Sequence, residues 1–286
     1  YKNIGNGGGY RIILDWTQSA LLAKDIRKYF PQIHITAVEQ DVSFQAQYRL
    51  YKNEKNLIKK IFRYVIYKNG KHCELKALNE CDKVKVLNNK DKKLLEGFVP
   101  AEKISGIAPY YDILSAKTEY TQNDKSIIFY GAMSRKENVD AVIWFIENVF
   151  NKLDGSYKFY IIGNKPDPIL EKYKSENVIL TGFVEDVSVY AKNALCFVVP
   201  LLQGAGIKVK VLEAFAMAVP VLTNDIGIEG IADKAQDGSV YLHCATGDDY
   251  VKNIKLLDAD KNLSKSIGKS AFEYVLSNFN YKEGTY

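Results

Sequence analysis

Short apolar runs alternate with longer amphipathic segments through the second half of the chain. The runs include SIIFYGA from Ser126, YKFYIIGN from Tyr157 and LCFVVPL from Leu195. These runs are apolar at nearly every position, so both faces of each strand must be covered, as in a parallel sheet with helices on each side. The pattern from residue 126 onward therefore predicts a doubly wound α/β domain.

The first half of the chain repeats this pattern more weakly. Apolar runs near residues 11, 34, 83 and 104 predict about four strands, with a long helical stretch that ends near Asn79. Four strands are few for a doubly wound domain, and the chain opens in the glycine-rich sequence GNGGGY, so we expect this domain to be truncated. A polar segment predicts a hinge near 110–125. The predicted domains are 1–115 and 116–286.

Composition excludes several classes of protein. The hydrophobic fraction of 47% and charged fraction of 26% are those of a globular protein and argue against disorder. The net charge of +5 is not gathered in one block, so we expect no nucleic-acid partner. The four cysteines lack metal-ligand spacing.

Location can also be predicted from the sequence. No apolar run approaches about 18 residues and the N-terminus does not resemble a signal peptide, so we expect a cytoplasmic protein. A peripheral contact would place it at the inner membrane face, although no amphipathic basic helix stands out strongly enough to assert this. Oligomeric state cannot be read from the sequence.

The glycine-containing sequence GAGIKVKVLEA follows an apolar run directly and opens a helical pattern. Ligands bind at the carboxyl ends of parallel strands, and a helix N-terminus offers amides and partial positive charge to a phosphate. Gly204 and Gly206 permit close backbone approach. Lys208 and Lys210 are expected in the first helical turn, where positive charge opposes the helix dipole unless an anion lies nearby. They therefore predict a diphosphate site.

Glu213 lies further along the same helix. Val209, Leu212 and Ala216 are expected to form its buried stripe, which would place the Glu213 carboxylate at the edge of the stripe, within reach of a ribose diol. A solvated helix face with a Lys–Glu salt bridge explains the same string equally well. The residues alone leave both interpretations open.

The segment GAGIKVKVLEAFAMAVPVLTNDIGIEGI resembles the donor-site signature of family 4 (group 1) glycosyltransferases, in the form GxGxKxKxLEA. FYGAMSRKENVDAVIWF, FYIIGN and LTGFVEDVSVYAKNALCFVVP follow the order of that family, and together these pieces span about 126–231. The resemblance implies a GT-B fold, in which two Rossmann-like domains face a cleft. It also implies sugar transfer from a nucleotide diphosphate sugar to a hydroxyl acceptor, namely a glycan, polysaccharide or lipid-linked acceptor.

The resemblance also implies roles for particular residues. The loop that begins at Gly131 would supply Arg135 or Lys136 to the diphosphate, and the backbone around Phe183 and Val184 would hold the base. The first acid of a Glu-x7-Glu motif is replaced by Ala205, so amides around Gly206 and Ile207 are expected to contact the donor sugar. The expected donor-binding residues are Gly131, Arg135, Lys136, Phe183, Val184, Gly204, Gly206, Ile207, Lys208, Lys210 and Glu213.

The segment ITAVEQDVSF resembles the strand end where many members of the family carry His-Asp. Gln40 occupies the histidine position. Glu39 or Asp41 would orient an acceptor hydroxyl or accept its proton, and we favour Asp41, although structural capping explains it equally well. The expected catalytic residues are then Asp41, Lys208 and Glu213.

The resemblance implies a retaining reaction, and the lack of an obvious DxD pair favours one that needs no metal and no cofactor. A nucleotide-sugar-binding module without activity is the main alternative, because the first domain is expected to be incomplete. A nicotinamide-dependent dehydrogenase fits poorly, since Gly7, Gly8 and Gly9 precede a strand where that fingerprint requires glycines after it.

Overall fold

The computed structural model describes residues 10–106, 120–121 and 124–280. The chain divides into two compact units, each treated below by itself: Tyr1–Ala108 with Ala205–Ile207, and Pro109–Gly204 with Lys208–Tyr286. The predicted boundary at 115/116, most of the predicted hinge and the glycine run at 7–9 lie outside the described residues.

The first unit contains a parallel sheet whose described strands follow the order β1-β2-β3-β4. Its strands are β1 Arg11–Asp15, β2 His34–Glu39, β3 Lys83–Val86 and β4 Ile104–Gly106. Its short helices are α1 Thr17–Ala20, α2 Ala23–Tyr29, α5 Asn89–Leu95 and η1 Ala101–Lys103. Apolar residues of the sheet, such as Ile35 and Val84, and of the helices, such as Leu78, form the core. The parallel pairing confirms the α/β prediction for this half.

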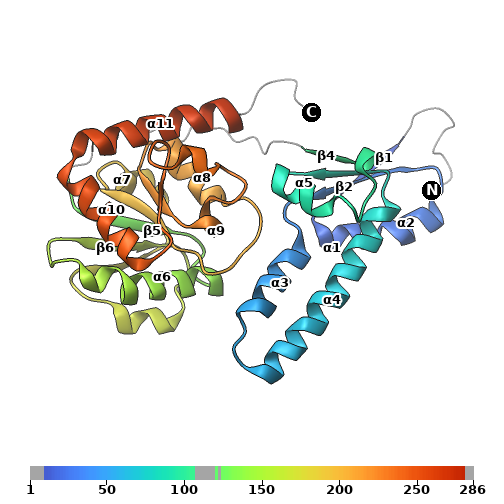
Figure 1. Ribbon diagram of the computed structural model, residues 1–286, viewed down its shortest axis with the longest axis horizontal. Helices are drawn as coiled ribbons and strands as arrows, with labels where there is room; N and C mark the ends of the chain where they lie inside the picture. Colours follow the sequence, from blue (N-terminus) through green and yellow to red (C-terminus); the bar gives the residue numbers. More distant parts are fainter. Residues whose placement is uncertain (1–9, 107–119, 122–123, 281–286) are drawn as a thin grey trace. The chain divides into compact units, whose positions relative to one another are not determined.

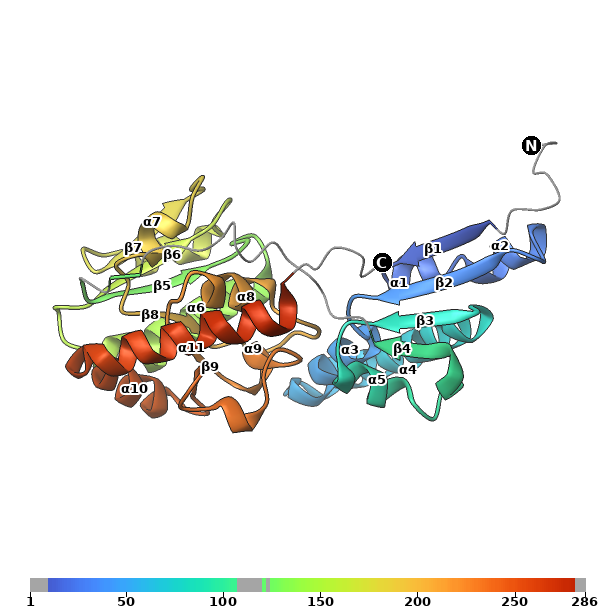
Figure 2. The ribbon, with the colours of Figure 1, turned by 90° about the horizontal axis from the view of Figure 1, so that it is seen from above.

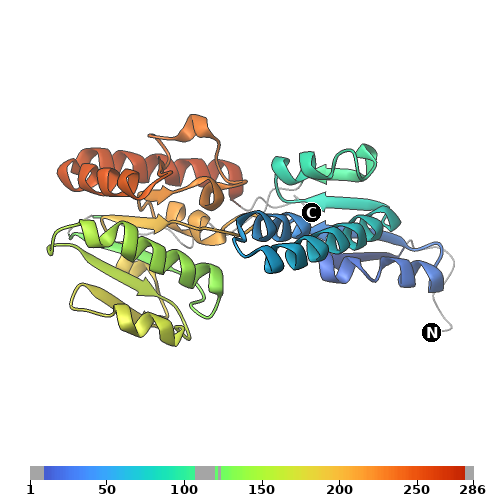
Figure 3. The same ribbon diagram turned by 60° about the horizontal axis from the view of Figure 1, so that its bottom comes forward.

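Two helices replace the single helical stretch expected before Asn79. Helix α3 covers Ser43–Asn53 and α4 covers Leu57–Glu80. The break is set by Asn56, whose side chain accepts a hydrogen bond from the Lys59 amide and so caps the start of α4. Figure 1 shows α3 and α4 side by side, with their joined ends directed away from the sheet of the first unit; the turned view in Figure 3 shows the same pairing.

The second unit contains a parallel sheet with the order β10-β9-β8-β5-β6-β7. The strands are β5 Ser126–Tyr130, β6 Lys158–Ile162, β7 Val178–Gly182, β8 Cys196–Val199, β9 Val221–Thr223 and β10 Leu242–His243. The α-helices are α6 Lys136–Asn148, α7 Ser188–Ala191, α8 Val209–Ala216, α9 Asp225–Ile228, α10 Gly247–Ala259 and α11 Lys261–Phe279. The 3-10 helices are η2 Phe150–Lys152, η3 Pro168–Tyr173 and η4 Lys234–Gln236. Figure 2 shows the strands of this sheet with α11 and α6 beside them.

The strand order of the second unit contains a reversal. The chain proceeds outward from β5 to β6 and β7, and then returns to place β8 on the other side of β5, where Ile127 pairs with Cys196. The loops that follow β5 and β8 leave the sheet in opposite directions here. This place, the switch point of the sheet, is where open α/β sheets bind ligands. The doubly wound prediction is confirmed.

The core of the second unit is rich in aromatic residues. Phe145 and Phe159 lie with their ring centroids 4.8 Å apart, and the Tyr250 ring meets Phe145 edge-on at 5.9 Å. Cys196 and Cys244 are buried in this unit and Cys81 in the first, whereas Cys73 on α4 is exposed. Among the described residues, none of the helices combines the length and apolarity needed to cross a bilayer.

Candidate functional site

The loop after β8 adopts a conformation that requires glycine. Gly204 has φ 134° and Gly206 has φ 68°, both in the region that other residues rarely adopt. A Cβ atom on Gly204 would lie 3.4 Å from Cε of Lys208, so this lysine packs over the glycine. Lys208 is the N-cap residue of α8 and does not lie in its first turn, where we expected it. Lys210 does lie in that turn, as expected.

Lys210 connects the helix after β8 with the loop after β5. Its Nζ donates a hydrogen bond of 2.7 Å to Oδ1 of Asn138 and lies 4.4 Å from the ring centroid of Phe129. A Cβ on Gly131 would lie only 2.7 Å from Nζ, so a larger residue there would displace the end of the lysine side chain. Asn138 is itself held by a 2.9 Å bond from Nδ2 to the carbonyl of Ala132.

The environment of Lys210 disfavours the charged form of this side chain. Burial lowers the pKa of the Lys210 ammonium to about 7, and although Glu137 acts in the opposite direction, the positive charges of Lys208 and Arg135 lower it further. Three basic groups therefore repel one another at the switch point. An anion bound among them would remove this repulsion.

Glu213 is held by a residue of β5. Tyr130, the last residue of that strand, donates a hydrogen bond from its hydroxyl group to Oε2 of Glu213. The same hydroxyl oxygen lies 3.2 Å from the carbonyl oxygen of Lys210. Burial, followed by the nearby Glu213 charge, raises the pKa of Tyr130 well above its usual value, so its hydroxyl remains a donor. The exposed carboxylate of Glu213 is thus oriented from the sheet.

The buried stripe of α8 differs from the prediction at one position. Leu212 and Ala216 are buried as expected, together with Val211 and Phe215, but Val209 is 39% exposed. Because α8 begins at Val209, this residue lies at the rim of the sheet where the helix has not yet reached the core.

Arg135 and Lys136 take different positions after β5. Arg135 is the N-cap residue of α6, lies 3.7 Å from Glu137 and contributes to the lowered pKa of Lys210. Lys136 instead forms an ion pair of 2.6 Å with Asp140 along α6. Arg135 therefore belongs to the basic cluster at the switch point.

The remaining expected donor residues lie elsewhere. Phe183 and Val184 follow Gly182, which has φ 71°, at the end of the outer strand β7, and Phe183 is 69% exposed. Ala205, Gly206 and Ile207 group with the first unit. The structure thus brings together Gly131, Arg135, Lys208, Lys210 and Glu213, and adds Tyr130 and Asn138, which the sequence reasoning missed.

In the first unit, three successive residues at the end of β2 differ in burial and partners. Glu39 is fully buried, and its Oε2 accepts a 2.6 Å bond from Thr17. Burial raises the pKa of Glu39 to about 8. Gln40 donates to Asp15 at 2.8 Å, and Asp41 is partly buried just after the strand. Asp41 is therefore better placed to meet a ligand than Glu39.

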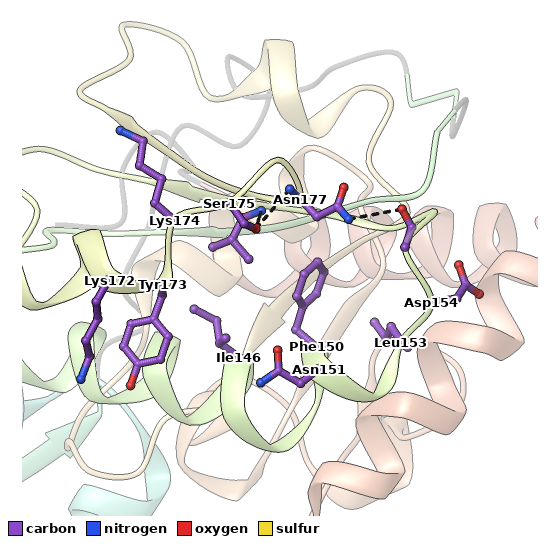
Figure 4. A pocket seen from close by; sticks show the side chains of 12 residues that line it. Ile146, Phe150, Asn151, Leu153, Asp154, Lys172, Tyr173, Lys174, Ser175 and Asn177 are labelled. Carbon is purple, nitrogen blue, oxygen red and sulfur yellow. Dashed lines mark hydrogen bonds between the residues drawn. The ribbon is translucent and has the colours of Figure 1, made fainter.

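A surface pocket of about 490 Å³ lies at the opposite edge of the second unit's sheet (Figure 4). It is formed by segments that lead into the amino ends of β6 and β7, away from the loops after β5 and β8. Its polar groups already pair with one another: Asn177 donates to the Gly155 carbonyl at 3.3 Å, and the Val178 amide donates to Ser175 at 3.0 Å. This pocket contains none of the expected donor-binding residues.

Two Rossmann-like units built from parallel sheets define the class of protein, which is that of the GT-B fold. Solved glycosyltransferase structures share this architecture. Residues 124–259, most of the second unit, match the model of a family described as Glycosyl transferases group 1.

Individual proteins are similar to this chain in sequence or in structure, and the solved structures support the same fold. An uncharacterized 44.6 kDa protein in the cps region of Klebsiella pneumoniae is 23% identical over 82% of this chain and 62% of its own length. TarM of S. aureus gives a TM-score of 0.72 at 19% identity, covering 94% of this chain and 52% of TarM. Anabaena HepE, crystallised with UDP, gives a TM-score of 0.73 at 11% identity, covering 95% of this chain and 75% of HepE. The chain thus spans little more than half the length of TarM.

Proposed function

We propose that the second unit binds the diphosphate of a nucleotide sugar at its switch point, and that the protein transfers the sugar to a hydroxyl acceptor. The observation that carries this proposal is the cluster of Arg135, Lys208 and Lys210, in which burial and like charge lower the pKa of Lys210 to about 7. A diphosphate placed there would pair with all three charges and meet the amides at the start of α8.

The groups around this cluster suit the other parts of the donor. Glu213, oriented by Tyr130, would accept hydrogen bonds from a ribose diol. The exposed Phe183 and the adjacent backbone would hold the base, while amides of Gly206 and Ile207 would contact the sugar. This arrangement is supported by the family match of residues 124–259 and by UDP in the similar HepE crystal.

Catalysis would be electrostatic. As the glycosidic bond stretches, negative charge builds up on the leaving diphosphate, and the three basic side chains stabilise that charge more than they stabilise the intact donor. The reaction would be retaining and would need no metal or cofactor. Asp41 would orient the acceptor hydroxyl, and the acceptor would be a glycan, a polysaccharide or a lipid-linked acceptor.

The donor site can be tested by calorimetric titration with UDP, ADP and GDP and with their sugars. We expect one nucleotide to bind selectively, and Lys208→Ala, Lys210→Met and Glu213→Ala each to weaken it at least about tenfold. The matched control is the exposed pair Lys269 and Glu273 on α11, whose alanine variants should bind like the wild type. Equal loss in the control, or no binding of any nucleotide, would refute the donor site.

A binding module without activity is the second candidate. It is favoured by Gln40, which occupies the position of the expected histidine and is tied to Asp15. Tight donor binding without transfer and without slow donor hydrolysis would select this candidate, whereas release of free sugar from the bound donor would establish an active transferase site.

A further inference from the structure

Helix α4 carries an uncovered apolar stripe. Its first three turns place Leu57, Ile58, Ile61, Phe62, Val65 and Ile66 at successive i, i+1, i+4 and i+5 positions, which lie on one face of a helix. All six side chains are exposed, with Ile58 at 81% and Phe62 at 67%. A contiguous apolar face of this kind is unusual on a protein surface and marks an interaction site.

The stripe is held outward by packing on the opposite side of the helix. Tyr64 and Tyr67 of α4 meet Tyr51 of α3 with ring centroids 5.2 and 6.5 Å apart, and Tyr48 meets Tyr67 at 5.2 Å. Because these rings occupy the seam between α3 and α4, the stripe cannot turn into that seam without breaking the aromatic packing. The face is therefore built into the helical pair.

Positive charge is concentrated around the stripe, so the expectation that the net charge is not gathered in one block is wrong for this segment. Residues 49–71 contain eight Lys and Arg and one Glu, a net charge of +7, whereas the whole chain carries only +5. The single acid, Glu54, is ion-paired with Arg63 at 2.8 Å. Lys55, Lys59 and Lys68 are exposed beside the apolar face. The rest of the chain is thus slightly acidic, and its basic character resides in this segment.

An apolar stripe among lysines has the chemistry of a helix that lies in a membrane interface. The apolar side chains enter the acyl boundary and the lysines meet anionic headgroups. A second copy of this chain fits the same face poorly, because a symmetric contact would bring two +7 surfaces together. The charge therefore distinguishes a lipid surface from self-association.

We propose that the tip of the α3–α4 pair, residues 49–71, docks the protein on an anionic membrane surface. Leu57, Ile58, Ile61 and Phe62 insert, while Lys55, Lys59 and Lys68 bind headgroups. This docking rests on the first unit alone and does not depend on the donor site. The sequence showed no basic amphipathic helix strong enough to assert such a contact; the exposure of the stripe supplies the missing observation.

The test is flotation of the full chain with vesicles of phosphatidylcholine alone and with added phosphatidylglycerol. We expect binding only to the anionic vesicles, weakened by salt. Ile58→Asn with Phe62→Asn should reduce it at least about tenfold, and Lys55→Gln, Lys59→Gln and Lys68→Gln together should reduce it about a hundredfold. Since all five side chains are exposed, thermal unfolding should be unchanged.

Matched controls lie in the second unit. Val189→Asn replaces an equally exposed apolar residue, and Lys261→Gln with Lys265→Gln and Lys269→Gln removes three exposed lysines from α11. Both should bind vesicles like the wild type, and every variant should keep wild-type nucleotide affinity. Absence of vesicle binding, binding that the tip variants leave unchanged, or self-association that Ile58→Asn and Phe62→Asn abolish would each overturn the proposal.

Discussion

Lys210 lies in an environment that disfavours a charged lysine side chain. Its ammonium lies against the Phe129 ring, bonded to the Asn138 side chain, near two other basic residues. Such a group is close to half charged at neutral pH when its pKa is about 7. Its protonation state should therefore respond to whatever binds beside it.

Nucleotide binding should accordingly take up a proton. At about pH 8 the unliganded Lys210 is mostly neutral, and a diphosphate restores its charge by raising its pKa. The buffer supplies the proton that is taken up, so binding enthalpies measured in Tris and in HEPES should differ because the two buffers have different ionisation enthalpies. The difference should correspond to the uptake of up to about one proton. Lys210→Met should abolish the difference; identical enthalpies for the wild type would contradict this role.

The hydroxyl of Tyr130 should matter through Glu213. Tyr130→Phe keeps the ring that packs on Phe197 but removes the hydrogen bond to Glu213. We expect nucleotide affinity to fall about fivefold to tenfold, with the unfolding free energy lowered by about 1 kcal/mol. Tyr173→Phe removes a similar hydrogen bond to Glu147, away from the switch point, and should leave affinity unchanged. Equal affinities of the two variants would show that Tyr130 does not position Glu213.

At the scale of elements, the start of α3 depends on a buried acid. Glu74 of α4 accepts hydrogen bonds of 2.9 Å from the Ser43 and Phe44 amides, so it satisfies the first turn of α3. Burial raises the pKa of Glu74 to about 7, although these two bonds oppose the shift. Glu39 nearby, with a pKa of about 8, adds a second buried carboxyl group.

The first unit should therefore lose stability as pH rises. Between the ordinary pKa of 4.5 and the raised values near 7 and 8, the folded state holds protons that the unfolded state releases. Urea unfolding should show a loss of about 1 to 3 kcal/mol between about pH 5 and pH 8. Glu39→Gln should flatten the profile and Glu96→Gln, at an exposed position, should not. A profile that rises with pH would contradict the assignment.

Most elements around the site could be predicted from the sequence, but not their side-chain partners. The apolar runs located the strands, and the glycines at 204 and 206 marked the loop that needs positive φ. The pairs Tyr130–Glu213 and Lys210–Asn138 join residues 83 and 72 positions apart, which no local pattern records. Gly163 was also missed: a Cβ there would lie 1.9 Å from the Gly131 carbonyl, a constraint set by neighbouring strands.

Some secondary structure was misjudged because context overrides propensity. The amphipathic segment PILEKYK forms the 3-10 helix η3 and not an α-helix, and it starts at a proline capped by Asp167. The apolar run SVYLHC forms only the short strand β10, Leu242–His243. The stripe of α4 has a clear helical period in the sequence, but such stripes normally face a core; its exposure follows only from the tyrosine packing against α3.

At the scale of the whole molecule, the two proposed ligands should protect different segments. Hydrogen exchange should slow near residues 129–140 and 204–216 when the nucleotide binds, and near 49–71 when anionic vesicles bind. Neither ligand should protect the other segment. Vesicle-induced protection confined to the second unit would refute the membrane assignment, and nucleotide-induced protection confined to 49–71 would refute the donor site.

The uneven burial of the cysteines makes the chain suited to site-selective labelling. Burial raises the pKa of Cys81 to about 11 and of Cys244 to about 12, and raises that of Cys196 as well, so these thiols resist alkylation. Cys73 is exposed on α4, two turns beyond the apolar stripe. A maleimide fluorophore should therefore attach there without engineering and report directly, by its change in emission, when the tip of the α3–α4 pair leaves water.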